Sequence, residues 1–170
     1  MLSSQTVRSV VCATALLSIS VASGVTARSA VHPSWAAQAG ADAITQLAIE
    51  RRCGGCVREL SIRIDAGGSA VKTVLGNARM GTVDHRFAGE STPAAFHDVA
   101  VVAAAANFFD LRDEYRADST ADGETLTTTA IAGGRSKSVL DANKAGPAAL
   151  RRLESAMLAF DQSVTWKEIR

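Results

Sequence analysis

The stretch that decides the fold is ELSIRIDAGGSAVKTVL, residues 59–75. Over residues 60–64, leucine and isoleucine alternate with polar side chains, which is the pattern of a strand with one buried face. The pair Gly67-Gly68 then supplies the positive φ angles that a tight hairpin turn requires. A return strand is expected over residues 70–75, so the stretch predicts an antiparallel hairpin that packs on a core.

Further strands and a helix are expected on either side of this hairpin. The strand pattern starts upstream at Ile44, and a weaker strand is expected downstream over residues 79–87. Thr92-Pro93, a capping residue followed by proline in the first turn, predicts the start of a helix. Apolar residues over 96–106 fall three and four apart and so face a sheet. Asn107 is expected to end this helix.

The last third of the chain predicts a second hairpin and a second helix. A threonine-rich strand over residues 124–132 is turned by Gly133-Gly134 into a return strand over 135–141. Gly146-Pro147 opens the helix, whose apolar stripe begins at Leu150. The order of elements predicts an α+β fold, with an antiparallel sheet of about six strands in the order ββββ-α-ββ-α and two helices packed on one face.

The N-terminal segment has the pattern of a secretory signal. Arg8 precedes a short apolar run that closes on Val25-Thr26-Ala27, with small residues before the expected cut. The run is too short and too interrupted to span a bilayer as a finished helix. We therefore expect a signal peptide over residues 1–27, a flexible linker over 28–43 and a single α+β domain over 44–170. This predicts a periplasmic or secreted protein.

The predicted mature chain is electrically neutral. The whole chain has 18 Lys and Arg against 17 Asp and Glu, and the leader removes one basic residue, Arg8. Neutrality leaves no electrostatic footprint for nucleic acid or for an anionic membrane surface. We therefore expect no nucleic acid as partner. We also expect an unknown envelope protein or a small ligand as partner, no cofactor, and no integral membrane segment after signal cleavage.

Two cysteines remain after cleavage, in the motif Cys53-Gly54-Gly55-Cys56. An even pair in an oxidising compartment indicates a structural disulfide. A redox pair is the alternative, but it needs its first cysteine at a helix N-terminus, whereas residues 57–64 alternate as a strand. Two free thiols are the third possibility.

The sequence offers no complete metal or catalytic set. Zinc needs four ligands, and only His85 and His97 accompany the two cysteines, at no recognised spacing. Residues 118–123 imitate the start of a calcium loop, but Thr129 stands where a bidentate Glu is required, so we interpret them as a turn. A nucleophile elbow is missing as well. No catalytic residue is therefore predicted.

Several spaced motifs lie between about Leu47 and Trp166. After the Cys-Gly-Gly-Cys segment they are Phe108-Phe109-x-Leu111-x-x-x-Tyr115, Asp122-x-x-Thr125, Gly134-x-x-Lys137-x-Val139, Pro147-x-x-Leu150-x-x-Leu153-Glu154 and a closing Trp166. In order and spacing they resemble an uncharacterised bacterial exported-domain family, catalogued as domain of unknown function 6438. The family usually has the pattern Cys-x-Gly-x-Cys-Pro-x-Tyr, whereas here the cysteines are one residue closer, with Val57 and Glu59 at the last two positions. The resemblance implies an exported α+β domain and no particular activity. The positions that match the family pattern, and that we expect to be structural, are Phe108, Phe109, Leu111, Tyr115, Lys137, Val139, Pro147, Leu150, Leu153 and Trp166.

The leading hypothesis from the sequence is a small exported binding or interaction domain of the cell envelope, with an exposed patch of sheet as its binding surface. The alternative is a thiol–disulfide redox protein that uses Cys53 and Cys56. The aromatic residues are expected mainly in the core, because five Phe, one Tyr and two Trp are few for a domain of this size.

Overall fold

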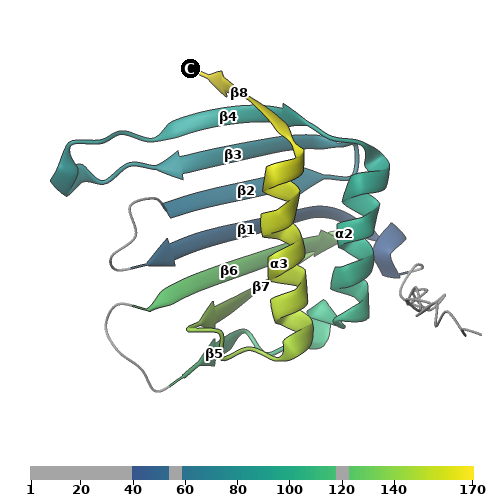
Figure 1. Cartoon of the computed structure of the whole chain (residues 1–170). Helices are drawn as coiled ribbons and strands as arrows, with labels where there is room; N and C mark the ends of the chain where they lie inside the picture. Colours follow the sequence, from purple (N-terminus) through teal and green to yellow (C-terminus); the bar gives the residue numbers. More distant parts are fainter. Residues whose placement is uncertain (1–39, 54–58, 118–122) are drawn as a thin grey trace, which may run out of the picture. The chain divides into compact units, whose positions relative to one another are not determined.

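The computed structural model describes residues 40–53, 59–117 and 123–170. Eight strands in this part of the chain form one sheet, in the order β5-β7-β6-β1-β2-β3-β4-β8 (Figure 1). Neighbouring strands are antiparallel except β5 and β7, which are parallel. The predicted α+β class is therefore confirmed.

The elements have the following bounds. The strands are β1 (Ile44–Cys53), β2 (Glu59–Asp65), β3 (Ser69–Leu75), β4 (His85–Glu90), β5 (Glu114–Arg116), β6 (Glu124–Ala132), β7 (Arg135–Ala142) and β8 (Thr165–Ile169). The helices are α2 (Pro93–Ala105) and α3 (Ala148–Ser163), with short 3-10 turns η1 (Ala78–Met80) and η2 (Phe108–Asp110).

The hairpin of β2 and β3 forms where the alternation predicts it. Ile62 lies opposite Lys72 and Ile64 lies opposite Ala70. Of the two glycines in the turn, Gly68 has a positive φ of 89°. A Cβ at Gly68 would also lie 2.5 Å from the carbonyl oxygen of Ser91, so both the backbone angle and the close approach require glycine.

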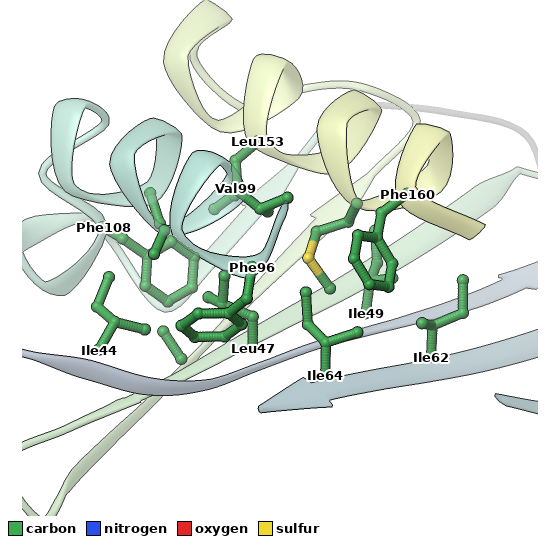
Figure 2. Packing of buried hydrophobic residues seen from close by; sticks show 14 of the residues in the cluster. Ile44, Leu47, Ile49, Ile62, Ile64, Phe96, Val99, Phe108, Leu153 and Phe160 are labelled. Carbon is green, nitrogen blue, oxygen red and sulfur yellow. The ribbon is translucent and has the colours of Figure 1, made fainter. Parts of the chain in front are cut away.

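Both α2 and α3 pack on one face of the sheet and enclose the core (Figures 1 and 2). Thr92 caps α2 by accepting a hydrogen bond from the backbone N–H of Ala95 at 3.1 Å, and Pro93 is its first residue. Asn107 has a left-handed φ of 48° after the end of α2, as predicted for a helix stop. Figure 2 shows isoleucines and leucine from β1 and β2 beneath phenylalanine and leucine side chains from the helices.

The predicted six strands are too few, because both edge strands were missed. β5 has only three residues, and β8 has exposed Lys167 and Glu168 at its centre, so neither shows clear alternation. The predicted strand over residues 79–87 is also wrong in its bounds. Residues 78–80 form the turn η1, and β4 begins only at His85.

The packed domain begins earlier than the predicted boundary at residue 44. Residues 40–42 are helical, and Ala41 is buried in the core cluster. Residues 40–42, which the sequence assigns to the linker, therefore belong to the packed domain. The rest of the predicted linker and the predicted signal peptide lie outside the described residues.

Candidate functional site

The candidate site is the β3–β4 loop, residues 76–84, which projects from the end of its hairpin (Figure 1). Polar side chains close this loop on itself. The N–H of Gly76 donates to Asp84 Oδ1 at 2.8 Å, and the N–H of Asn77 donates to Thr82 Oγ1 at 2.7 Å. The N–H of Arg79 donates to Asn77 Oδ1 at 3.0 Å. The loop therefore has a defined conformation built from local hydrogen bonds.

Gly76 allows the two arms of the loop to lie in contact. A Cβ at this position would lie 2.5 Å from the carbonyl oxygen of Thr82 and 2.5 Å from the carbonyl carbon of Val83. At Gly81 the requirement is different, because its φ is 68° and no atom lies near the Cβ position. The first glycine is needed for space and the second for backbone angle.

The loop holds two large apolar side chains in solvent. Met80 is 73% exposed and Val83 is 69% exposed, the highest values among large apolar residues in the described ranges. Single exposed apolar residues are ordinary, whereas this loop carries two of them only three positions apart in the chain. We call Met80 and Val83 the apolar tip.

A groove of about 390 Å³ lies between the loop and the adjoining strands. His85 lies at the groove, and its Nδ1 is 2.7 Å from Glu168 Oε1 on β8. Both of these side chains are exposed, so the pair contributes little to stability. The lining residues are Val74, Leu75, Gly76, Thr82, Val83, His85 and Phe87.

Lys72 on β3 lies beside the groove residue Phe87 and contacts residues of α3 and β8. Lys72 Nζ lies 2.9 Å from Asp161 Oδ1 and 4.6 Å from the centroid of the Trp166 ring. Trp166 Nε1 donates to the carbonyl oxygen of Asp161 at 2.9 Å. The ammonium group of Lys72 thus has both an ionic and a cation–π partner, which indicates a structural role.

A second unusual cluster is a buried carboxyl pair on β7 and α3. Asp141 is 1% exposed and Glu154 is 2% exposed. Asp141 Oδ1 accepts a hydrogen bond from the N–H of Gly146 at 2.9 Å. Burial, and then the negative charge of Asp141, raises the pKa of Glu154 to about 8. Glu154 therefore retains its proton at neutral pH, which avoids two buried negative charges side by side.

The family-pattern residues are spread across the sheet and do not converge on one site. Phe108, Val139, Leu150 and Leu153 are buried core residues. Phe109, Leu111, Tyr115 and Trp166 are partly buried against that core, Lys137 forms an ion pair with Asp113, and Pro147 precedes α3. Tyr115 on β5 and Trp166 on β8 lie on the two opposite edge strands.

Only the first cysteine of the predicted pair lies within the described residues. Cys53 is the last residue of β1, and Cys56 lies outside the described residues, so the disulfide and the redox pair stay predictions. Residues 118–122 of the calcium-like segment also lie outside that range.

The two histidines considered as metal ligands lie on different elements. His85 is on β4, and His97 Nδ1 on α2 lies 3.5 Å from Asp42 Oδ1. Within residues 40–53, 59–117 and 123–170, no three potential His, Cys, Asp or Glu ligands lie together.

Sequence reasoning missed the apolar tip and the carboxyl pair. The tip falls inside the predicted strand over residues 79–87, although Gly76 and Gly81 both signal a turn there. Glu154 follows Leu150 by four residues and precedes Met157 by three, so the helical period itself places it on the buried stripe.

No protein-family model matches the chain, and no curated protein matches it either. The resemblance to the exported-domain family therefore stays a prediction that rests on the motifs. None of the helices in the described ranges has the length and apolar character needed to cross a bilayer.

Proposed function

We propose that the protein is a small exported binding domain of the cell envelope and that the β3–β4 loop is its binding surface. The observation that carries this proposal is the exposure of Met80 and Val83 on a loop closed by its own hydrogen bonds. A surface that is already ordered loses little conformational freedom when it binds, so more of its contact energy appears as affinity.

The face of the sheet opposite α2 and α3 is a weaker candidate, although the sequence predicts an exposed patch of sheet as the binding surface. Leu126, Thr128 and Ala130 of β6 face the helices, so the threonines between them point to the opposite face. Thr129 Oγ1 already pairs with Ser138 Oγ at 2.8 Å on this face. The apolar tip exposes more apolar surface per residue than this polar ladder and is therefore the better anchor.

The redox alternative gains no support from the position of Cys53. A reactive first cysteine is favoured at a helix N-terminus, where the helix dipole stabilises the thiolate. Cys53 instead ends the strand β1.

Site-specific photo-crosslinking in exporting cells tests the proposal. The full chain carries a photoreactive amino acid at position 80, or at the exposed position 162 on α3 as the matched control. We expect cross-linked products in the envelope fraction from position 80 only, and their loss when Val83→Ser is added. Equal cross-linking from positions 80 and 162, or no cross-linking from position 80, would overturn the proposed binding surface.

A further inference from the structure

We propose that Asp141 and Glu154 form a proton-controlled latch, which holds the connection between β7 and α3 closed while Glu154 carries a proton and releases it when that proton is lost. The connection comprises residues 143–147. It lies on a different part of the sheet from the β3–β4 loop, so the latch is independent of the proposed binding function. Three features define it: two adjacent buried carboxyl groups, a left-handed backbone in the connection, and the hydrogen bonds that hold this backbone in place.

The two carboxyl groups lie next to each other in the core. Both side chains are almost fully buried, and Asp141 hydrogen-bonds with Glu154. Asp141 Oδ2 and Glu154 Oε1 are buried without a hydrogen-bond partner within the described residues. Two carboxylates have only acceptors to offer each other, so a hydrogen bond between them requires a proton. The closed arrangement therefore contains at least one protonated carboxyl group.

The charged groups that act on Glu154 do not offset a second negative charge. Glu124 on β6 adds negative charge to that of Asp141, and Arg151 on α3 opposes it. Arg151 is itself exposed, and its Nη1 donates to backbone carbonyl oxygens. Neither Asp141 nor Glu154 forms an ion pair with another described residue. A second carboxylate here would be buried without a cation in contact, which is costly.

The other elements packed around the pair bring little compensating charge. Arg51 on β1 lies in the same cross-strand row as Asp141, but Leu126 of β6 stands between them. Helix α2 lies beside α3 (Figure 1), and its residues 99–105 have no charged side chain. The proton on Glu154 is therefore the main means of keeping the pair buried.

The connection itself has an unfavourable backbone. Asn143 and Lys144 are consecutive residues with left-handed φ angles of 60° and 59°. Asparagine tolerates this region, whereas the Cβ of lysine crowds the following carbonyl oxygen. The connection therefore stays in this conformation only while its surroundings hold it there.

Side chains of β7 and α3 hold the connection closed. Asp141 Oδ1 accepts the N–H of Gly146 at 2.9 Å, and Arg151 Nη1 donates to the carbonyl oxygens of Lys144 and Gly146 at 3.0 and 3.2 Å. Pro147, at the start of α3, provides no side-chain cap. A Cβ at Gly146 would lie 2.8 Å from Asp141 Oδ2, so the connection packs directly on the carboxyl pair.

Loss of the proton favours opening at this connection. Gly146 is buried against Asp141, whereas Lys144 and Pro147 are exposed, so the connection is the thin layer between the pair and solvent. Its opening hydrates both carboxylates and relieves the left-handed backbone. Burial, and then the charge of Asp141, raises the pKa of Glu154 to about 8. The opening constant should therefore rise with pH, by up to about tenfold per pH unit between 5 and 8.

Amide hydrogen exchange tests the latch with the protein recovered from cells that export the full chain. Exchange rates are measured from pH 6 to 9 and divided into the intrinsic rate at each pH, which gives a protection factor. Protection of the Gly146 N–H should fall by up to about tenfold per pH unit as far as pH 8. The N–H of Ser91, which donates to the carbonyl oxygen of Gly68 at 2.8 Å, is the control and should keep its protection.

Two variants show whether Glu154 is responsible. Glu154→Gln keeps the size of the side chain and does not titrate, so protection at Gly146 should no longer depend on pH. Glu168→Gln removes an exposed carboxylate on β8 and should keep the fall seen in the wild type. Carbon-13 NMR titration of Glu154 in the wild type needs no variant and should give a midpoint near 8.

Any of four results would overturn the latch. They are constant protection at Gly146, an equal fall at Ser91, an unchanged fall in Glu154→Gln, and a titration midpoint of Glu154 near its ordinary value of 4.5. An equal fall at Ser91 would mean that the whole fold loosens with pH, and the other three would mean that Glu154 does not control the connection.

Discussion

The β3–β4 loop and the first turns of α3 depart from the usual distribution of side chains in opposite directions. The loop places the apolar Met80 and Val83 in solvent and uses polar side chains to close its backbone. The region where α3 meets β7 places the carboxyl groups of Asp141 and Glu154 in the interior. One region therefore exposes what is normally buried, and the other buries what is normally exposed.

The two regions differ in the free energy that their unusual side chains cost the folded state. An exposed apolar side chain costs the folded state little, because it is also exposed in the unfolded chain. A buried carboxylate loses its hydration and must find hydrogen bonds or a proton. The exposed apolar side chains of the loop therefore cost the folded state little free energy and can serve a partner. The contribution of the carboxyl pair to the free energy of unfolding depends instead on its hydrogen bonds and on pH.

The largest expected effect is that of Asp141→Ala. The substitution leaves the N–H of Gly146 without its acceptor and opens a void beside Glu154, so we expect a loss of about 3 kcal/mol in the free energy of unfolding. Urea unfolding at pH 7 measures it. Asp113→Ala removes an aspartate whose side chain is 86% exposed and should cost less than about 1 kcal/mol. Equal losses in both variants would show that burial of Asp141 has no special energetic role.

The next effect is the pH dependence that Glu154 confers. Its pKa is about 8 in the folded protein against an ordinary value of 4.5, so the folded state holds the extra proton between these values. The free energy of unfolding should then fall as pH rises from 5 to 8, by up to about 1.4 kcal/mol per pH unit. Urea unfolding of the wild type and of Glu154→Gln over pH 5–9 measures it. The variant should lose this slope, and an identical slope would contradict the assignment.

Local sequence signals predict some elements of this fold and miss others. Alternation and glycine pairs locate the strands that have one buried face, and Thr92-Pro93 locates the start of α2, because these signals are local. The edge strands β5 and β8 lack such a signal, since their side chains stay largely exposed. The closure of the β3–β4 loop depends on side chain–backbone hydrogen bonds across the loop, as from Asn77 to Thr82, which no periodicity encodes.

A smaller effect is expected for Gly76→Ala in the loop. The new Cβ would overlap the backbone of Thr82 and Val83, so the arms must separate, at a cost of about 2 kcal/mol. Gly133→Ala in the β6–β7 turn provides the contrast, because that residue has a φ of 56° and open space, and should cost about 1 kcal/mol. Urea unfolding ranks the two variants. Faster amide exchange at Asn77 in Gly76→Ala would confirm that the loop has opened, and unchanged exchange would contradict the steric account.

The smallest effect on stability is expected for substitutions in the apolar tip, where the proposed effect on binding is largest. Met80→Ser/Val83→Ser removes two side chains that are exposed in both the folded and the unfolded states, so the free energy of unfolding should change by less than about 0.5 kcal/mol. The midpoint and slope of urea unfolding measure it. A neutral result would show that the fold does not need these side chains and that lost binding reports on contact with a partner. A loss of about 2 kcal/mol or more would instead mean that the tip packs against part of the chain, and the contrast with the carboxyl pair would disappear.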